Sequence, residues 1–291
     1  MTGNDTTFFR HVAQQREGVH LALLAAAVII LFGASVTLPL FGDDVILVAR
    51  AEAVNWSLRD LSRSFELGIQ DFTVGWVPEA FEGYRLYFFR PVFMAVLKAD
   101  HALWGHWEPG YHILNLFLAW SVAALLYVWT ADFGFSHGER LLAALLFLLY
   151  TVNYTAINWI AGRTELFAAT LMLASLVCLG RFYRDRRIAW YVAALVAYVL
   201  ALGSKENAVV LPFLHVLAAM TLYRDPVQFG TLRQRLLAIG PYFLLLLVYF
   251  ALRAWALGGF PVPVEGYYYH SPWHPDFPRF ALTKTAHAVL T

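Results

Sequence analysis

The sequence predicts an all-α integral membrane protein, built as a bundle of several membrane-spanning helices. Hydrophobic residues make up 60% of the 291 residues and charged residues 14%, whereas soluble domains have about 25% charged residues. The apolar residues come in long blocks, and aromatic residues reach 16%, which is typical of a chain with many membrane–water boundaries. The net charge of +1 gives no basic field of the kind that attracts nucleic acid.

The first predicted span covers residues 19–40. No charged residue stands between His20 and Asp43, and the stretch has the roughly 20 residues that a helix needs to cross a bilayer. It lacks a clear small-residue cleavage site, so we interpret it as a retained helix and not as a signal peptide.

Residues 41–110 are too polar for a span and are predicted to form a long first extracytoplasmic loop. The loop contains two amphipathic stretches, which we expect to be helices lying in the membrane interface. Packing of these helices into a soluble subdomain is the alternative. The apolar positions are Val54, Leu58, Leu61 and Phe65 in the first stretch, and Val92, Phe93, Val96, Leu97, Leu103 and Trp104, after Pro91, in the second.

The rest of the chain alternates apolar blocks with short loops. Residues 280–291 read as the start of a further helix that is too short to span, so we expect the chain to be part of a longer protein. With the first span this gives seven spans and a partial eighth in a single domain, residues 1–291. The predicted spans are 111–130, 140–154, 165–182, 188–203, 208–223 and 236–257.

The basic residues of the short loops predict the orientation. Short cytoplasmic loops are enriched in Lys and Arg, so we assign the arginine-rich set and the N-terminus to the cytoplasm and the long first loop to the outside, with a bacterial inner membrane as the expected location. The arginine-rich set is Arg140, Arg181, Arg184, Arg186, Arg187, Arg224, Arg233 and Arg235, against Arg163, Lys205 and Arg279 in the opposite set.

Two adjacent aspartates, Asp43 and Asp44, directly follow the first span. Acidic side chains at the exit of a membrane helix are costly against lipid and so usually face protein or water. A carboxylate there can act as a general base or bind a cation. The alternative is that the pair caps the next helix, since Asp favours helix N-termini. We favour catalysis or substrate contact, because one cap needs only one acid.

The outer loops offer further groups that suit a phosphate and a sugar. Arginine and lysine bind phosphate, and cations near a leaving phosphate help because its charge grows in the transition state. Ordinary alternatives exist for each: charges that bound a span, a plain polar loop, a solvated histidine and an interfacial tyrosine. The predicted substrate-binding residues are Arg163, Glu165, Lys205, Glu206, His270 and Tyr268.

Several function classes are excluded by what the sequence lacks. The single cysteine, Cys178, allows neither an internal disulfide nor a metal site built on thiolates. No glycine-rich nucleotide-binding motif is present. We therefore predict no cofactor and no metal-binding residues, while a divalent cation at Asp43 and Asp44 stays open.

With these residues placed, the chain resembles the GT-C glycosyltransferases. It is most similar to the protein O-mannosyltransferase-like branch, which includes the transmembrane and tetratricopeptide-repeat mannosyltransferases, although no such repeats are present here. The matching stretches come in the same order and cover about residues 40 to 215. They are FGDDVIL at 41–47, a stretch at 89–120 that contains FRP and GYHxxN, NWIAGRTELFAATLMLASL at 158–176, and GSKENAVVLPFLH at 203–215.

The resemblance implies an inverting transfer of a sugar, with mannose among the candidates, from a polyprenyl- or dolichyl-phosphate donor. The acceptor would be an extracytoplasmic protein, glycan or lipid. The acidic pair would hold the catalytic base, with Asp44 favoured over Asp43. Arg163, Glu165, Lys205 and Glu206 match the charged outer-loop motifs, with the two cations expected near the phosphate.

Two other classes of protein remain open. A transporter or flippase of lipid-linked precursors needs polar or broken helices along a path to the bilayer midplane, and the predicted spans are almost uniformly apolar. A noncatalytic membrane scaffold predicts that Asp44, Lys205 and Arg163 lie on unconnected surfaces.

Overall fold

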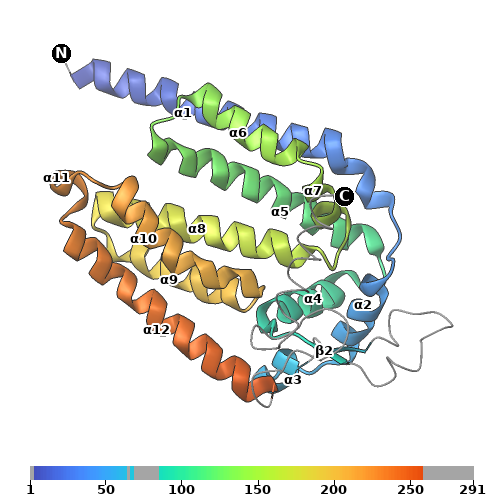
Figure 1. Ribbon diagram of the computed structural model, residues 1–291. Coiled ribbons are helices and arrows are strands. Elements are labelled where there is room, and N and C mark those ends of the chain that lie inside the picture. Colours follow the sequence, from blue (N-terminus) through green and yellow to red (C-terminus); the bar gives the residue numbers. More distant parts are fainter. Residues whose placement is uncertain (1–2, 64–65, 69–84, 258–291) are drawn as a thin grey trace, which may run out of the picture.

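The computed structural model describes residues 3–63, 66–68 and 85–257. Seven of the described helices run side by side along the bundle, and a cluster of other elements covers one end of it (Figure 1). The helices of the bundle are α1 (Gly3–Phe32), α5 (Glu108–Trp129), α6 (His137–Leu149), α8 (Arg163–Asp185), α9 (Ile188–Leu202), α10 (Leu211–Thr221) and α12 (Leu232–Leu257). The cluster holds α2 (Asp43–Ala53), α3 (Leu58–Arg63), α4 (Pro91–Trp104) and α7 (Val152–Asn158).

The helices have the lengths and compositions of membrane spans. Four of them, over Arg16–Thr37, Glu108–Phe133, Arg163–Asp185 and Leu232–Ala256, are long and apolar enough to cross a bilayer. The consecutive helices α6 and α7 make a fifth candidate. The helices α9 and α10 are apolar but shorter. Each of the seven predicted ranges therefore contains helix, while four or five of the described helices meet the length criterion, and residues 280–291 lie outside the described part.

The predicted span 140–154 is bent. Helix α6 ends at Leu149 and α7 begins at Val152, at an angle of 73°. The side-chain amide of Asn153 donates to the carbonyl of Phe147 at 2.6 Å, and the backbone N–H of Tyr150 donates to the same carbonyl at 3.3 Å. The sequence alone did not reveal this break, because apolar residues continue on both sides of it.

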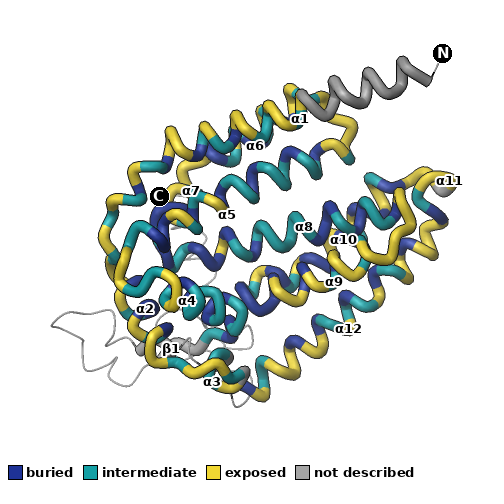
Figure 2. Tube along the Cα trace, turned by 180° about the vertical axis from the view of Figure 1, so that it is seen from behind, coloured by how far each residue is buried: buried dark blue, intermediate teal, exposed yellow. Residues whose placement is uncertain are grey.

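The outer surface of the bundle is apolar. Figure 2 shows exposed residues along the outward sides of α1, α6 and α12, and these include Ile30 (81% exposed), Leu142 (57%) and Leu237 (66%). Soluble proteins rarely expose continuous apolar surface on this scale. The exposed belt is compatible with an integral, multi-pass membrane protein.

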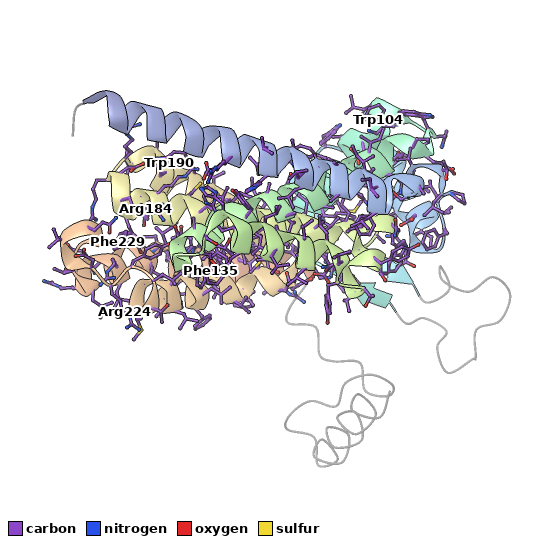
Figure 3. The ribbon with its side chains drawn as sticks, turned by 90° about the horizontal axis from the view of Figure 1, so that it is seen from above. Trp104, Phe135, Arg184, Trp190, Arg224 and Phe229 are labelled. Atoms are coloured by element: carbon purple, nitrogen blue, oxygen red, sulfur yellow. The ribbon has the colours of Figure 1, made fainter. Side chains whose placement is uncertain are left out.

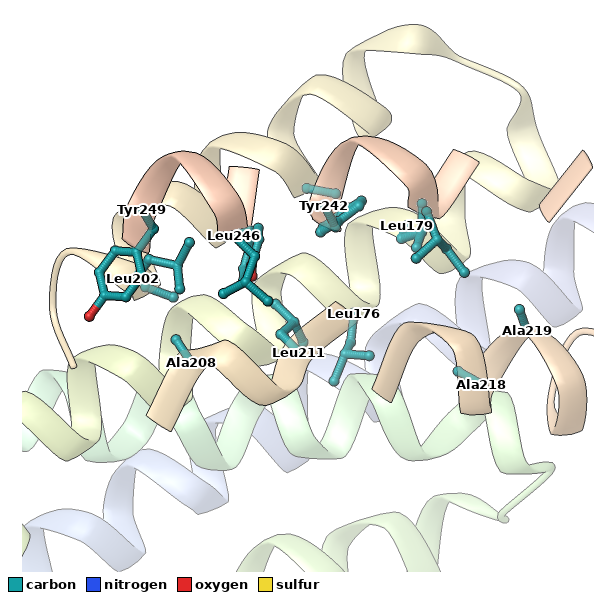
Figure 4. Close-up of a cluster of buried hydrophobic side chains, with 14 of the residues drawn as sticks. Leu176, Leu179, Leu202, Ala208, Leu211, Ala218, Ala219, Tyr242, Leu246 and Tyr249 are labelled. Carbon is teal, nitrogen blue, oxygen red and sulfur yellow. The ribbon is translucent and has the colours of Figure 1, made fainter. Parts of the chain in front are cut away.

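Two cores hold the bundle together. One packs α1, α5 and α6 around residues such as Leu24, Tyr127 and Leu148. The other lies between α8, α9, α10 and α12 (Figure 4), where Leu211 and Tyr242 are completely buried. These contacts hold α8, which carries one side of the candidate site, between the two halves of the bundle.

The elements at the covered end form a small core of their own, with Leu47, Phe93 and Leu97 at its centre. The second amphipathic stretch is helical as predicted, in α4, but Leu103 at its end is 73% exposed. The prediction of one helix through the first stretch was wrong: α2 ends at Ala53 and α3 begins at Leu58. The helix α2 packs on α4 through this core.

The described residues are all-helical as expected, apart from one very small sheet. Within the first loop, the short strands β1 (Glu66–Gly68) and β2 (Arg85–Tyr87) pair antiparallel, with Leu67 opposite Leu86. Three-residue strands leave almost no alternation for a sequence pattern to reveal.

The opposite end of the bundle carries the arginine-rich loops. Arg184 and Arg224 lie at that end, together with the short helix α11 (Pro226–Phe229), while Trp104 of α4 marks the other end (Figure 3). The structure thus places the arginine-rich set and the acidic pair at different ends of the same bundle.

Candidate functional site

The motifs that carry the resemblance lie next to one another at the end of the bundle near α2 and α4. The FGDD stretch reaches the AGRTEL stretch, because Asp44 accepts hydrogen bonds from the backbone of Ile160 and Ala161. The GYHxxN stretch reaches it as well, through Asn115 and Arg163. The FRP stretch meets the GSKEN stretch, where the N–H of Val92 donates to the carbonyl of Gly203 at 2.9 Å.

Asp44 is completely buried. Its Oδ1 accepts from the N–H of Ala161 at 2.7 Å and its Oδ2 from the N–H of Ile160 at 3.4 Å. Burial raises the pKa of Asp44 to about 6, and the backbone hydrogen bonds oppose part of that rise. The side chain holds the loop between α7 and α8 in place and does not line the pocket.

Asp43 is half-buried and lines a pocket. The N-cap of α2 is Gly42, whose φ of 57° lets the chain turn sharply into the helix, and no side chain caps the helix there. Both acids lie in the first turn of α2, where the Asp43 carboxylate accepts from its own backbone N–H and the Asp44 carboxylate accepts from Ile160 and Ala161 instead. Burial raises the pKa of Asp43, which strengthens it as a base.

Arg163 is completely buried at the start of α8. Its Nε donates to Oδ1 of Asn115 and its Nη2 to the carbonyl of Tyr111, both at 2.5 Å, and its Nη1 pairs with Asp100. All three nitrogen atoms are thus engaged inside the protein. The sequence placed this guanidinium at a lipid phosphate, whereas the structure makes it the link between α4, α5 and α8.

Glu165, Lys205 and Asn207 form a polar group on one wall of the pocket. The ammonium group of Lys205 pairs with Glu165, and the amide of Asn207 donates to the same carboxylate at 3.1 Å. The ion pair is partly exposed, with 21% of the Lys205 side chain accessible. An exposed pair contributes little to stability, and the ammonium group can therefore exchange Glu165 for a phosphate at small cost.

A second cation, Arg90, lines the same pocket. Its guanidinium binds the Glu206 carboxylate through Nε and Nη2, with 2.8 Å between Nη2 and Oε2, and Arg253 approaches the same carboxylate at 4.0 Å. Arg90 was not among the site residues predicted from the sequence. The clue to Arg90 in the sequence is that it belongs to the FRP motif, and this motif lies beside the GSKEN stretch in the folded protein.

The pocket has a volume of about 860 Å³ and two chemically different parts. Asp43, Arg90, Glu165, Lys205 and Asn207 form the polar part. The apolar part follows one face of α8, where the lining residues recur at helical spacing through Glu165, Ala169, Met172, Leu173 and Leu176. That face is about 16 Å long at 1.5 Å per residue. The pocket thus suits a ligand with a charged head and an apolar tail.

The site residues predicted from the sequence fall into three sets: pocket residues with their partner, buried residues, and residues outside the described part of the chain. Asp43, Glu165 and Lys205 share one pocket, and Glu206 binds the pocket residue Arg90. Asp44 and Arg163 are buried beneath it, and His270 and Tyr268 lie outside the described residues. Of the three residues whose scatter a noncatalytic scaffold predicts, Lys205 lines the pocket, while Asp44 and Arg163 are buried and reach no surface.

No metal-binding group of three His, Cys, Asp or Glu residues includes Asp43 or Asp44 in the described part of the chain. The described residues do bring Glu52, His101 and His106 together, away from the pocket lining.

Comparison with protein-family models, with curated proteins and with solved structures finds no match to this chain.

Proposed function

We propose that this protein is a membrane glycosyltransferase of the GT-C type, which transfers a sugar from a polyprenyl- or dolichyl-phosphate donor to an extracytoplasmic protein, glycan or lipid acceptor. The observation that carries the proposal is the two-part pocket, in which Asp43, Lys205 and Arg90 stand at one end of an apolar wall along α8. The motif stretches that resemble this family meet around the pocket.

In the proposed reaction the acceptor hydroxyl attacks the anomeric carbon of the donor. Asp43 takes the proton of the hydroxyl as the new carbon–oxygen bond forms, and the bond from the sugar to the phosphate breaks on the opposite face. The products are the glycosylated acceptor, with inverted configuration, and the prenyl monophosphate. The raised pKa of Asp43 supports its use as the base.

The charged neighbours have separate parts in this proposal. Lys205 and Arg90 bind the phosphate and stabilise the negative charge that it gains as the sugar leaves. Glu165 and Glu206 hold these two cations in position through their ion pairs. Asp44 and Arg163 are positioning residues, since both fix the backbone at the start of α8 without reaching the pocket.

The apolar wall of α8 takes the prenyl chain. Met172, Leu173 and Leu176 present the apolar surface that such a chain needs, and its burial stabilises the complex by roughly 25 cal/mol per Å² of apolar surface. The proposal places the N-terminus in the cytoplasm and the pocket on the outer side of a bacterial inner membrane, following the arginine-rich loops at the opposite end.

The test is to incubate the purified protein in detergent with individual prenyl-phosphate sugars and a mixed pool of acceptors, and to follow release of prenyl monophosphate by mass spectrometry. Release with one sugar donor that is abolished in Asp43→Asn and retained in Asp185→Asn, an exposed acid at the other end of α8, supports the proposal. Movement of the donor across sealed vesicles without any bond cleavage would replace it with a transport function.

A further inference from the structure

Outside the pocket, Glu52, His101 and His106 bring a carboxylate and two imidazoles together. Their ligand atoms all lie within 4.8 Å of one another. Glu52 belongs to the last turn of α2, His101 to the last turn of α4 and His106 to the connection between α4 and α5. Three separate elements thus contribute one side chain each.

The local backbone explains why the two histidines meet. Gly105, at the C-cap of α4, has a φ of 54°, and this left-handed conformation reverses the chain directly after the helix. The rings of His101 and His106 then lie edge to face with their centroids 5.8 Å apart. Packing of α2 on α4 brings Glu52 beside them.

The distances suit a small transition-metal ion. Zinc binds histidine nitrogen and carboxylate oxygen at about 2.0–2.2 Å, so two ligands of a tetrahedral ion stand about 3.4 Å apart. Nε2 of His101 lies 3.9 Å from Oε2 of Glu52, and a small rotation of the exposed Glu52 side chain closes that gap. Two imidazoles with one carboxylate favour zinc over magnesium or calcium, which prefer all-oxygen sites.

An ordinary ion pair between His101 and Glu52 explains less of the geometry. At 3.9 Å the pair is long, and among the described residues Nε2 of His101 is buried without a hydrogen-bond partner. An ion pair also gives no reason for a second imidazole at the same place. A shared cation accounts for all three side chains.

We propose that Glu52, His101 and His106 bind one Zn²⁺ ion, with a water molecule at the fourth position. The ion would tie the ends of α2 and α4 to the start of α5. Asp100, the partner of Arg163, directly precedes His101 on α4. The ion would therefore stabilise the packing of α4 against α2, the helix on which Asp43 and Asp44 lie. This site is independent of the proposed glycosyl transfer and acts on stability.

The experiment uses the full chain, purified with a tag that contains no histidine and treated with a chelator. Cobalt replaces zinc as the spectroscopic probe, because tetrahedral Co²⁺ absorbs visible light much more strongly than hydrated Co²⁺. We expect the wild type to bind one Co²⁺ per chain with this absorption and to release it on addition of Zn²⁺. We also expect Zn²⁺ to raise the melting temperature of the wild type, since it binds the folded state.

The variants Glu52→Gln and His106→Gln change exposed side chains, so both should keep the fold, which circular dichroism checks. Each should weaken Co²⁺ binding at least tenfold and remove the effect of Zn²⁺ on the melting temperature, while Asp185→Asn should change neither. The proposal is overturned if the wild type shows no saturable tetrahedral Co²⁺ spectrum, or if both variants bind with wild-type affinity.

Discussion

Oδ1 of Asp44 accepts a hydrogen bond of 2.7 Å from the backbone N–H of Ala161, across 117 residues of sequence. This bond joins the start of α2 to the loop before α8, and with it the acidic pair to the charged residues of the pocket. The two adjacent aspartates therefore lie in different surroundings: Asp44 is held inside the protein, and Asp43 lines the pocket.

The stability of the protein should depend on the protonation of Asp44. Its pKa in the folded state, about 6, exceeds the ordinary aspartate value of 3.8, so the folded state binds the proton more tightly than the unfolded state. The stability that the folded state gains from this tighter proton binding is fully present below about pH 4 and is lost as the pH rises through about 6. Between these two pH limits, the free energy of unfolding should fall by roughly 3 kcal/mol. Melting temperatures from pH 4 to 7 should fall more steeply for the wild type than for Asp44→Asn; parallel curves would contradict this.

The buried ion pair of Arg163 and Asp100 should show strong coupling. Removing one partner leaves a buried charge unpaired, so Asp100→Leu should destabilise the protein by about 3–5 kcal/mol. The double variant Asp100→Leu/Arg163→Met should recover much of that loss, because neither charge remains. A double-mutant cycle of unfolding free energies measures the coupling, and simple addition of the two single losses would refute it.

The sequence predicted these elements unevenly. Long apolar blocks such as 111–130 and 236–257 predict helices well, because their composition already sets both length and environment. The bend between α6 and α7 comes with a hydrogen bond from the Asn153 side chain to the carbonyl of Phe147, which no periodicity reveals. The burial of Arg163 depends on Asp100, 63 residues earlier in the chain. The motifs favoured Asp44 over Asp43 as the base and pointed to Arg163 as readily as to Lys205. Only packing distinguishes a pocket residue from a buried one.

The apolar wall of α8 should discriminate donors by chain length. Ala169 lines the pocket, and a tryptophan there would fill the space that the account gives to the prenyl chain. Ala169→Trp should raise KM at least tenfold for a long-chain donor and much less for a donor with a short prenyl chain. Ala189→Trp, on the exposed side of α9, is the matched control and should leave both values unchanged. Equal increases in KM for the two donors would show that α8 does not recognise the prenyl chain.

The cation Lys205 should matter more for the chemical step than for donor binding. A leaving phosphate gains charge in the transition state, so Lys205→Ala should lower kcat on the order of 100-fold while changing KM only modestly. Steady-state kinetics with a saturating acceptor measures both values. Lys98→Ala, a lysine of α4 whose ammonium group donates to the carbonyl of Ala51, serves as the control. A rise in KM alone would assign Lys205 to ground-state binding.

The base should set the acid side of the activity profile. Burial raises the pKa of Asp43, and a carboxylate must be ionised to accept a proton. Transfer should therefore fall as the pH decreases through a value above the 3.8 of a free aspartate. The measurement is the pH dependence of kcat/KM below neutral pH. An acid limb at or below 3.8 would argue against Asp43 as the base.

The most direct test compares single-turnover transfer rates of Asp43→Asn and Asp44→Asn, with donor binding measured separately for each. We expect Asp43→Asn to transfer at least about 100-fold more slowly than the wild type while still binding the donor, and folded Asp44→Asn to stay within tenfold of the wild-type rate. A wild-type rate in Asp43→Asn would contradict the assignment of the base.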